Sequence, residues 1–130
     1  MGSKLPELHL DSSNFIQIEN YYSSSCALKR NGTVQCWGSN GVGELGLGDT
    51  VNRGKKKEDL GSNLKHVDLG LPALALSHGS SAASVCALLI NHEIKCWGSG
   101  FSGQLGYEDN VSRGGSPNDM GDNLPFVRYK

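Results

Sequence analysis

Two stretches decide the fold, because one is a second copy of the other. The first reads CALKRNGTVQCWGSNGVGELGLGD over residues 26–49, and the second reads CALLINHEIKCWGSGFSGQLGYED over residues 86–109. The match continues without a gap to Val67 and Val127, and twenty of the forty-two aligned positions are identical. Such self-similarity at a fixed spacing predicts a tandem structural repeat.

Each copy opens with a predicted β-hairpin. In the first copy, strand-like residues 26–29 and 33–37 flank the loop Arg30-Asn31-Gly32, whose final glycine suits a left-handed backbone conformation. This three-residue loop places Cys26 opposite Cys36. In the second copy the same register places Cys86 opposite Cys96, with His92 at the glycine position.

Further strands are expected on either side of each hairpin. Residues 15–18 and 73–76 are expected to form the preceding strands, and residues 66–69 and 126–129 the last ones. The chain has 18 glycines in 130 residues, which disfavours long helices. We therefore predict an all-β protein of tandem propeller-type blades, each with three to four antiparallel strands. The expected division is an N-terminal tag or arm (1–14), a first blade (15–70) and a second blade (71–130).

The repeated motifs carry a family resemblance. The patterns CAL…CWG, followed by Gly-Glu-Leu-Gly at 43–46 or Gly-Gln-Leu-Gly at 103–106, resemble a cysteine-bearing variety of the regulator of chromosome condensation repeat family. That resemblance implies a β-propeller, usually of seven blades. Two blades leave open sheet edges and do not close a ring alone. Three outcomes stay open: a fragment of a longer propeller, a homo-oligomer that completes a ring, or a compact two-repeat structure.

The four cysteines allow three interpretations. Cross-strand disulfides Cys26–Cys36 and Cys86–Cys96 fit the predicted register, because opposed residues in a non-hydrogen-bonded pair lie close enough to bridge. The alternatives are buried free thiols and a zinc site, although the short Cys-x-x-Cys spacing of structural zinc is absent. Disulfides would favour an extracellular or periplasmic location, which the sequence otherwise leaves unknown.

Residues common to both copies are predicted to build the scaffold. Trp37, Trp97, Leu45 and Leu105 are predicted to pack between neighbouring blades, with a tryptophan ligand platform as the alternative. Loops that differ between otherwise similar copies are where binding is expected. The candidate binding residues are Asn40, Glu44, Arg53, Lys55, Lys56, Lys57, Phe101, Gln104, Tyr107 and Arg113. The aspartates repeated at 49 and 109, and at 59 and 119, are predicted to close turns.

Charge and motif content narrow the function. The formal net charge is -1, so nucleic-acid binding is not expected. No catalytic triad recurs, and no metal or cofactor is expected. We predict a non-enzymatic protein-binding scaffold whose partner the sequence does not name. Two alternatives are a guanine-nucleotide-exchange or chromatin-associated role, which the resemblance implies, and a secreted enzyme-inhibitor-like propeller.

Overall fold

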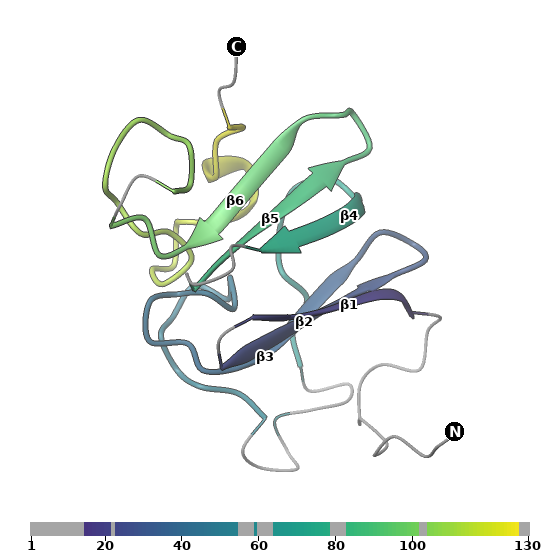
Figure 1. Cartoon of the computed structure of the whole chain (residues 1–130), viewed down its shortest axis with the longest axis horizontal. Helices are drawn as coiled ribbons and strands as arrows, with labels where there is room; N and C mark the ends of the chain where they lie inside the picture. Colours follow the sequence, from purple (N-terminus) through teal and green to yellow (C-terminus); the bar gives the residue numbers. More distant parts are fainter. Residues whose placement is uncertain are drawn as a thin grey trace.

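Two three-stranded antiparallel sheets form the molecule, one from each repeat (Figure 1). The computed structural model describes residues 15–21, 23–54, 59, 64–78, 83–101 and 104–127. The first blade contains β1 (Phe15–Tyr21), β2 (Ser24–Lys29) and β3 (Val34–Gly38). The second contains β4 (Ala73–His78), β5 (Ser84–Leu89) and β6 (Ile94–Gly98), and a 3-10 turn, η2 (Gly121–Asn123), follows it. The expected all-β architecture is confirmed.

The hairpin prediction is correct in both copies. Cys26 pairs with Cys36 across β2 and β3, and Cys86 pairs with Cys96 across β5 and β6. The third loop residue has the expected left-handed backbone, with φ of 91° at Gly32 and 68° at His92. Both hairpins therefore have the strand register that a three-residue loop predicts.

The predicted last strand at residues 66–69 is wrong. Val67 donates one backbone hydrogen bond to the carbonyl of Val34 (2.8 Å), and this single contact does not extend into a strand. The chain instead turns at Gly70, where φ is 81°. Val127 repeats the contact with Ile94 at 2.7 Å, and residues 128–129 lie outside the described part of the chain. Each described blade therefore has three strands.

The core runs from one blade into the other. Its buried members include Leu28 and Val34 from the first blade, and Leu76, Val85 and Trp97 from the second. The structure contains both predicted disulfides, Cys26–Cys36 and Cys86–Cys96. Figure 1 shows the loops that follow β3 and β6 on the same side of the two blades. In the described segments, no helix has the length and apolar character needed to span a membrane.

Candidate binding surfaces

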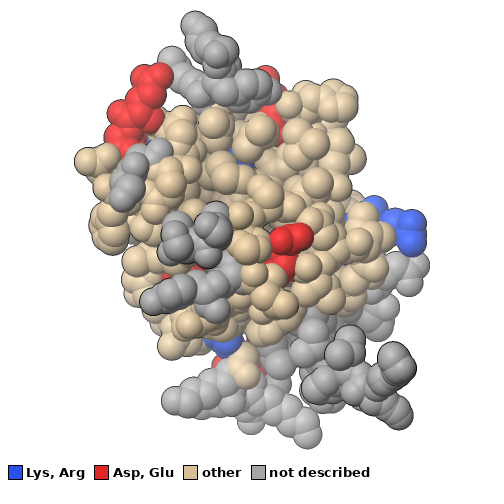
Figure 2. All heavy atoms as spheres, viewed as in Figure 1, with Lys and Arg blue, Asp and Glu red and all other residues tan. Residues whose placement is uncertain are grey.

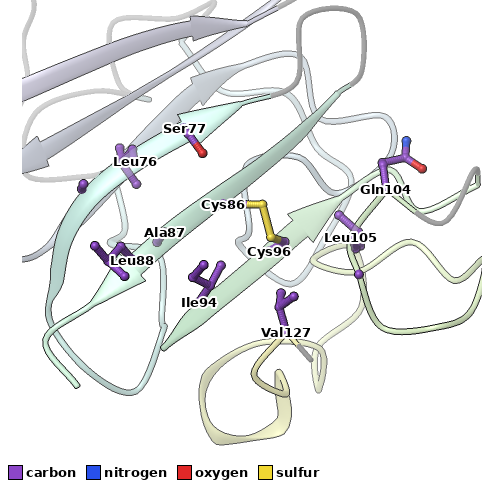
Figure 3. Close-up of a pocket in the computed structure, with 12 residues that line it drawn as sticks. Leu76, Ser77, Cys86, Ala87, Leu88, Ile94, Cys96, Gln104, Leu105 and Val127 are labelled. Carbon is purple, nitrogen blue, oxygen red and sulfur yellow. A yellow bond between two sulfur atoms is a disulfide. The ribbon is translucent and has the colours of Figure 1, made fainter. Parts of the chain in front are cut away.

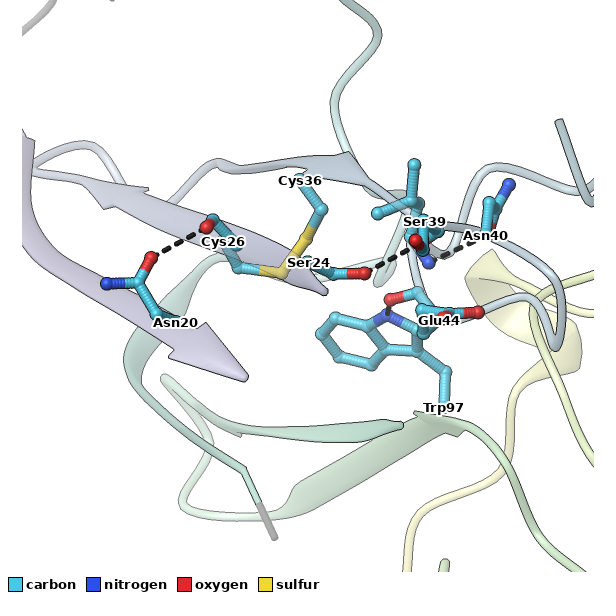
Figure 4. The surroundings of a disulfide bond; sticks show 10 residues. Asn20, Ser24, Cys26, Cys36, Ser39, Asn40, Glu44 and Trp97 are labelled. Carbon is cyan, nitrogen blue, oxygen red and sulfur yellow. Dashed lines mark hydrogen bonds between the residues drawn. A yellow bond between two sulfur atoms is a disulfide. The ribbon is translucent and has the colours of Figure 1, made fainter. Parts of the chain in front are cut away.

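Trp97 closes the junction between the blades. Its side chain is 0% exposed, and the indole Nε1 donates a hydrogen bond to the backbone carbonyl of Glu44 at 3.0 Å. Figure 4 shows this ring reaching from the second blade to the loop of the first, beside the Cys26–Cys36 disulfide. Gly46 leaves room for the ring, because a Cβ atom there would lie 2.9 Å from Nε1. Trp37, the equivalent residue, is only half-buried.

A polar seam joins β1 to β4 across the same junction. The Gln17 side chain donates to the carbonyl of Leu76 (2.7 Å) and accepts from its amide (2.9 Å). Glu19 Oε1 lies 3.2 Å from His78 Nε2. Sequence reasoning missed these residues because neither Gln17 nor Glu19 recurs in the second copy. Comparing the two copies for identical residues finds the positions of their shared scaffold. The two sides of the junction between the blades carry different residues, so this comparison does not find them.

Arg53 and Arg113 hold the loops in shape. Arg53 forms an ion pair with Asp49 at 2.9 Å, and Arg113 forms the equivalent pair with Asp109 at 3.1 Å. The backbones of both arginines also bridge to the ends of β3 and β6. Hydrogen bonding from Arg53 lowers the pKa of Asp49 below its ordinary value. The aspartates accept backbone hydrogen bonds two residues later, as the turn prediction requires.

Two other candidate residues lie inside the first loop. Asn40 is 0% exposed, and its amide donates to the carbonyls of Asp49 (2.9 Å) and Val51 (3.0 Å). Glu44 is 3% exposed and accepts a hydrogen bond from the amide of Val42 at 2.9 Å. Both side chains are therefore engaged within the loop rather than exposed at its surface.

Tyr107 occupies a half-buried position in the second loop. Its hydroxyl donates to the carbonyl of Cys96 and accepts from the Cys96 amide, both at 2.8 Å. The Arg113 guanidinium lies 4.3 Å from the ring centroid, within cation–π range. Burial raises the pKa of the Tyr107 hydroxyl. These contacts tie the second loop to β6.

A groove of about 240 Å³ lies between the loops of the two blades. Phe101, which is 67% exposed, forms part of its wall. Val51 and Val111, each adjacent in sequence to a wall residue, are 60% and 54% exposed. The lining residues come from both blades: Gly41, Val42, Thr50, Phe101, Ser112, Gly115, Ser116 and Asp119. The groove thus has a mixed polar and apolar lining that neither blade makes alone.

The remaining candidate residues are Gln104 and the three lysines. Gln104 is exposed, and its amide donates to Ser99 Oγ at 3.3 Å. Lys55, Lys56 and Lys57 lie outside the described residues. On the face drawn in Figure 2, described charges occur in small groups on a mostly uncharged surface. In the described part of the chain, no cluster of three metal-ligating side chains is present.

Lys95 is a further buried residue that sequence reasoning missed. Its side chain is 4% exposed, and Nζ donates to the carbonyls of Leu69 and Gly121, each at 2.9 Å. Burial lowers the pKa of Lys95, although the charges of Asp122 and Asp68 act in the opposite direction. Lys95 thus connects the segment between the two blades, at Leu69, with the C-terminal loop, at Gly121.

Comparison with known proteins identifies the repeats. The sequence profile of the Regulator of chromosome condensation (RCC1) repeat matches residues 15–44. The chain belongs to the RCC1 repeat family. It is 34% identical over 104 residues to the human Probable E3 ubiquitin-protein ligase HERC4, a match covering 80% of this chain and 9% of HERC4. The rat protein of the same name is 31% identical over the same length.

Solved structures of the RCC1 repeat family share the fold. Prp20p from Saccharomyces cerevisiae superposes with a TM-score of 0.67 at 13% identity, over 98% of this chain and 27% of Prp20p. Human WBSCR16 gives a TM-score of 0.59 at 13% identity, over 92% of this chain and 26% of WBSCR16. The chain thus spans about a quarter of these propellers and a far smaller part of HERC4.

Proposed function

We propose that this chain is a non-enzymatic protein-binding module that recognises its partner through the groove between the blade loops. The observation that carries the proposal is Phe101, an aromatic side chain 67% exposed on the wall of that groove. Aromatic residues are enriched among the side chains that dominate binding energy in protein interfaces. Phe101 stands beside polar groove residues such as Ser112 and Asp119, and protein interfaces combine aromatic anchors with polar groups in this way.

The scaffold supports this role by holding the groove in one shape. The ion pairs Arg53–Asp49 and Arg113–Asp109 fix each loop, and the Gly48 amide donates to the Gly114 carbonyl at 2.9 Å across the two blades. A preformed surface loses less conformational entropy on binding than a mobile one. These contacts support a groove that is preformed for its partner.

Family relatives add support at a coarser level. Prp20p has binding properties toward Gsp1p and histones, and yeast RCC1 (Prp20) has been solved with Kap60 bound to it. Those partners belong to those proteins, and at 13% and 18% identity the likeness carries only the fold to this chain. HERC4 is covered over only 9% of its length, so the ligase activity in its name is not assigned to this chain.

The disulfides support an oxidising compartment for the module. Cys26–Cys36 and Cys86–Cys96 account for all four cysteines of the chain. Disulfides persist in secreted and periplasmic proteins and are rare in the reducing cytosol. An extracellular or periplasmic inhibitor-like binder fits this chemistry better than an exchange factor or a chromatin protein.

Photo-crosslinking tests the proposed groove. A photoreactive phenylalanine analogue at position 101 should capture a protein from extracts of the source, whereas the same analogue at Ile90 should not. Ile90 is a matched control because it is 49% exposed but follows β5 at the hairpin end of the blade. The captured protein is then purified, and its affinity is measured by calorimetry. Phe101→Ala should weaken binding about tenfold or more, and an unchanged affinity would refute the groove.

A further inference from the structure

A second cavity, of about 370 Å³, opens on the outer face of the second blade. Its walls include Ala75, Leu88, Ile94, Leu105 and Val127, together with the Cys86–Cys96 disulfide. Figure 3 shows Leu88 of β5 and Ile94 of β6 together with Leu105 and Val127 from the loops and the disulfide, all around one pocket. The cavity lies on the sheet rather than in the loop groove. We call it the slot.

The slot corresponds to a surface that is already filled in the first blade. The equivalents of Leu88, Ile94 and Val127 are Leu28, Val34 and Val67, which are 0%, 0% and 6% exposed. These residues are buried together with Trp97 in one core cluster, whereas their counterparts in the second blade remain half-buried. In the first blade, this surface is covered by the face of the second blade that carries Trp97. The same kind of face is therefore expected to bind the slot.

The opposite face of the first blade presents the matching residues. Strand pairing makes Ile18 and Ser25 equivalent to Leu76 and Val85, because they occupy the same positions in their sheets. Leu76 is 5% exposed and Val85 is 0% exposed in the junction, whereas Ile18 is 50% exposed and Ser25 is half-buried. Trp37 likewise remains half-buried where Trp97 is fully buried. We call Ile18, Ser25 and Trp37 the tryptophan face.

We propose that the slot binds the tryptophan face of a second copy of this chain, so that copies associate head to tail. The indole of the incoming Trp37 would lie beside Cys86–Cys96, as Trp97 lies beside Cys26–Cys36 within the chain. Its Nε1 would donate to the backbone carbonyl of Gln104, which is the equivalent of Glu44. Gly106 repeats Gly46, with φ of 80° against 67°, so the backbone at this position has the same left-handed form in both copies.

A second copy is the occupant because one chain carries both halves of the interface. A head-to-tail contact between identical subunits repeats until it closes a ring, or it forms an open filament. Because each chain supplies two blades, three copies give six blades and four copies give eight, on either side of the usual seven, so a closed ring would hold three or four copies. The formal net charge of -1 per chain offers little electrostatic resistance to association.

The contact between copies lacks one feature of the internal junction. Gln17, which bridges both backbone groups of Leu76, is replaced at the equivalent position by Ala75. No amide is therefore available to bridge the backbone of the incoming Ile18. The contact between copies is accordingly weaker than the junction within one chain. Ala75→Gln would supply the missing amide at this position.

Light scattering coupled to size-exclusion chromatography tests the proposal on the full chain. At about 100 µM, where even weak contacts are populated, we expect a mass of three or four chains. Trp37→Ala should give monomers, and so should Ala75→Glu, which puts a charge into the slot. Mixing these two variants should give a heterodimer and nothing larger, because only one intact contact remains. Ala75→Gln should lower the dissociation constant about tenfold through two added hydrogen bonds.

Two results would overturn the proposal. A monomeric wild-type chain at that concentration would leave a further repeat of a longer polypeptide as the occupant of the slot. An assembly whose mass neither Trp37→Ala nor Ala75→Glu changes would place the contact elsewhere. Circular dichroism checks that the variants are folded, and the Ala75→Gln result does not depend on a loss of function. Phe101→Ala should leave the assembly unchanged, because Phe101 does not line the slot. The proposal for partner binding in the loop groove and the proposal for self-association through the slot can therefore fail independently.

Discussion

Gly46→Ala tests whether the junction closes as tightly as the structure shows. Gly46 has φ of 67°, a left-handed conformation that costs an L-residue about 1–2 kcal/mol. The new Cβ would also lie 2.9 Å from Trp97 Nε1 and 3.0 Å from Val67 Cγ1, closer than such atoms normally approach. Overpacking of this kind costs about 1–3 kcal/mol. The two costs together predict a loss of about 2–5 kcal/mol, a large part of the stability of a small domain.

Urea unfolding followed by tryptophan fluorescence measures this loss, because Trp97 sits at the junction. The measurement is best made in a Trp37→Ala background, so that self-association does not add to the apparent stability. Gly41→Ala is the matched control, since Gly41 lies in the same loop and a Cβ there would meet nothing within 4 Å. We expect the control to change stability by less than about 0.5 kcal/mol. Equal stability of the two variants would refute the packing described for Trp97.

Three further results are expected. Trp97→Phe should cost about 1–3 kcal/mol in urea unfolding, since the loop carbonyl that accepts from its indole is left buried without that donor. In the monomeric Trp37→Ala variant, mild reductant should open the disulfide Cys86–Cys96 before Cys26–Cys36, because Cys86 is half-buried and Cys26 is fully buried. Alkylation of the released thiols followed by mass spectrometry would show the order. The lowered pKa of Asp49 means that its ion pair stabilises the fold above the ordinary carboxyl value, and this stabilisation is lost as the pH falls through the lowered value. Between pH 6 and pH 3, Asp49→Asn should lose less stability than the wild type, by less than about 1 kcal/mol for so exposed a pair. Part of the loss should remain in this variant, because the pKa of Asp109 is lowered by Arg113 in the same way.

Local geometry could be predicted from the sequence because it depends on neighbours along the chain. A three-residue loop fixes which residues face each other, so the positions of Cys26 and Cys36 followed from Arg30-Asn31-Gly32 alone. The expected strand at residues 66–69 did not form. The Val67 side chain is buried in the core, while its backbone makes one hydrogen bond to Val34. The sequence pattern does not distinguish a buried anchor from a strand.

The candidate loop residues show a second limit. A polar residue in a glycine-rich loop is expected at the surface, yet Asn40 is fully buried. The loop has few regular backbone hydrogen bonds of its own, so the Asn40 amide satisfies the carbonyls of Asp49 and Val51 instead. In the second copy Gly100 takes this position, where a Cβ would lie 2.3 Å from the Val111 carbonyl oxygen. Positions 40 and 100 are therefore both buried for different reasons, and only the three-dimensional contacts reveal this.

The two tryptophans differ in environment although they share one sequence position. Trp37 and Trp97 stand in the same four-residue motif, Cys-Trp-Gly-Ser, so the motif alone predicts the same environment for both. In the structure one is fully buried and the other is half-buried, because burial at this position depends on the loop of a preceding blade. In repeat proteins, stability comes partly from each unit and partly from its contact with the next. The environment of Trp37 is thus set by whatever lies beside the first blade, which is why its fluorescence and accessibility should change when copies associate and remain fixed if they do not.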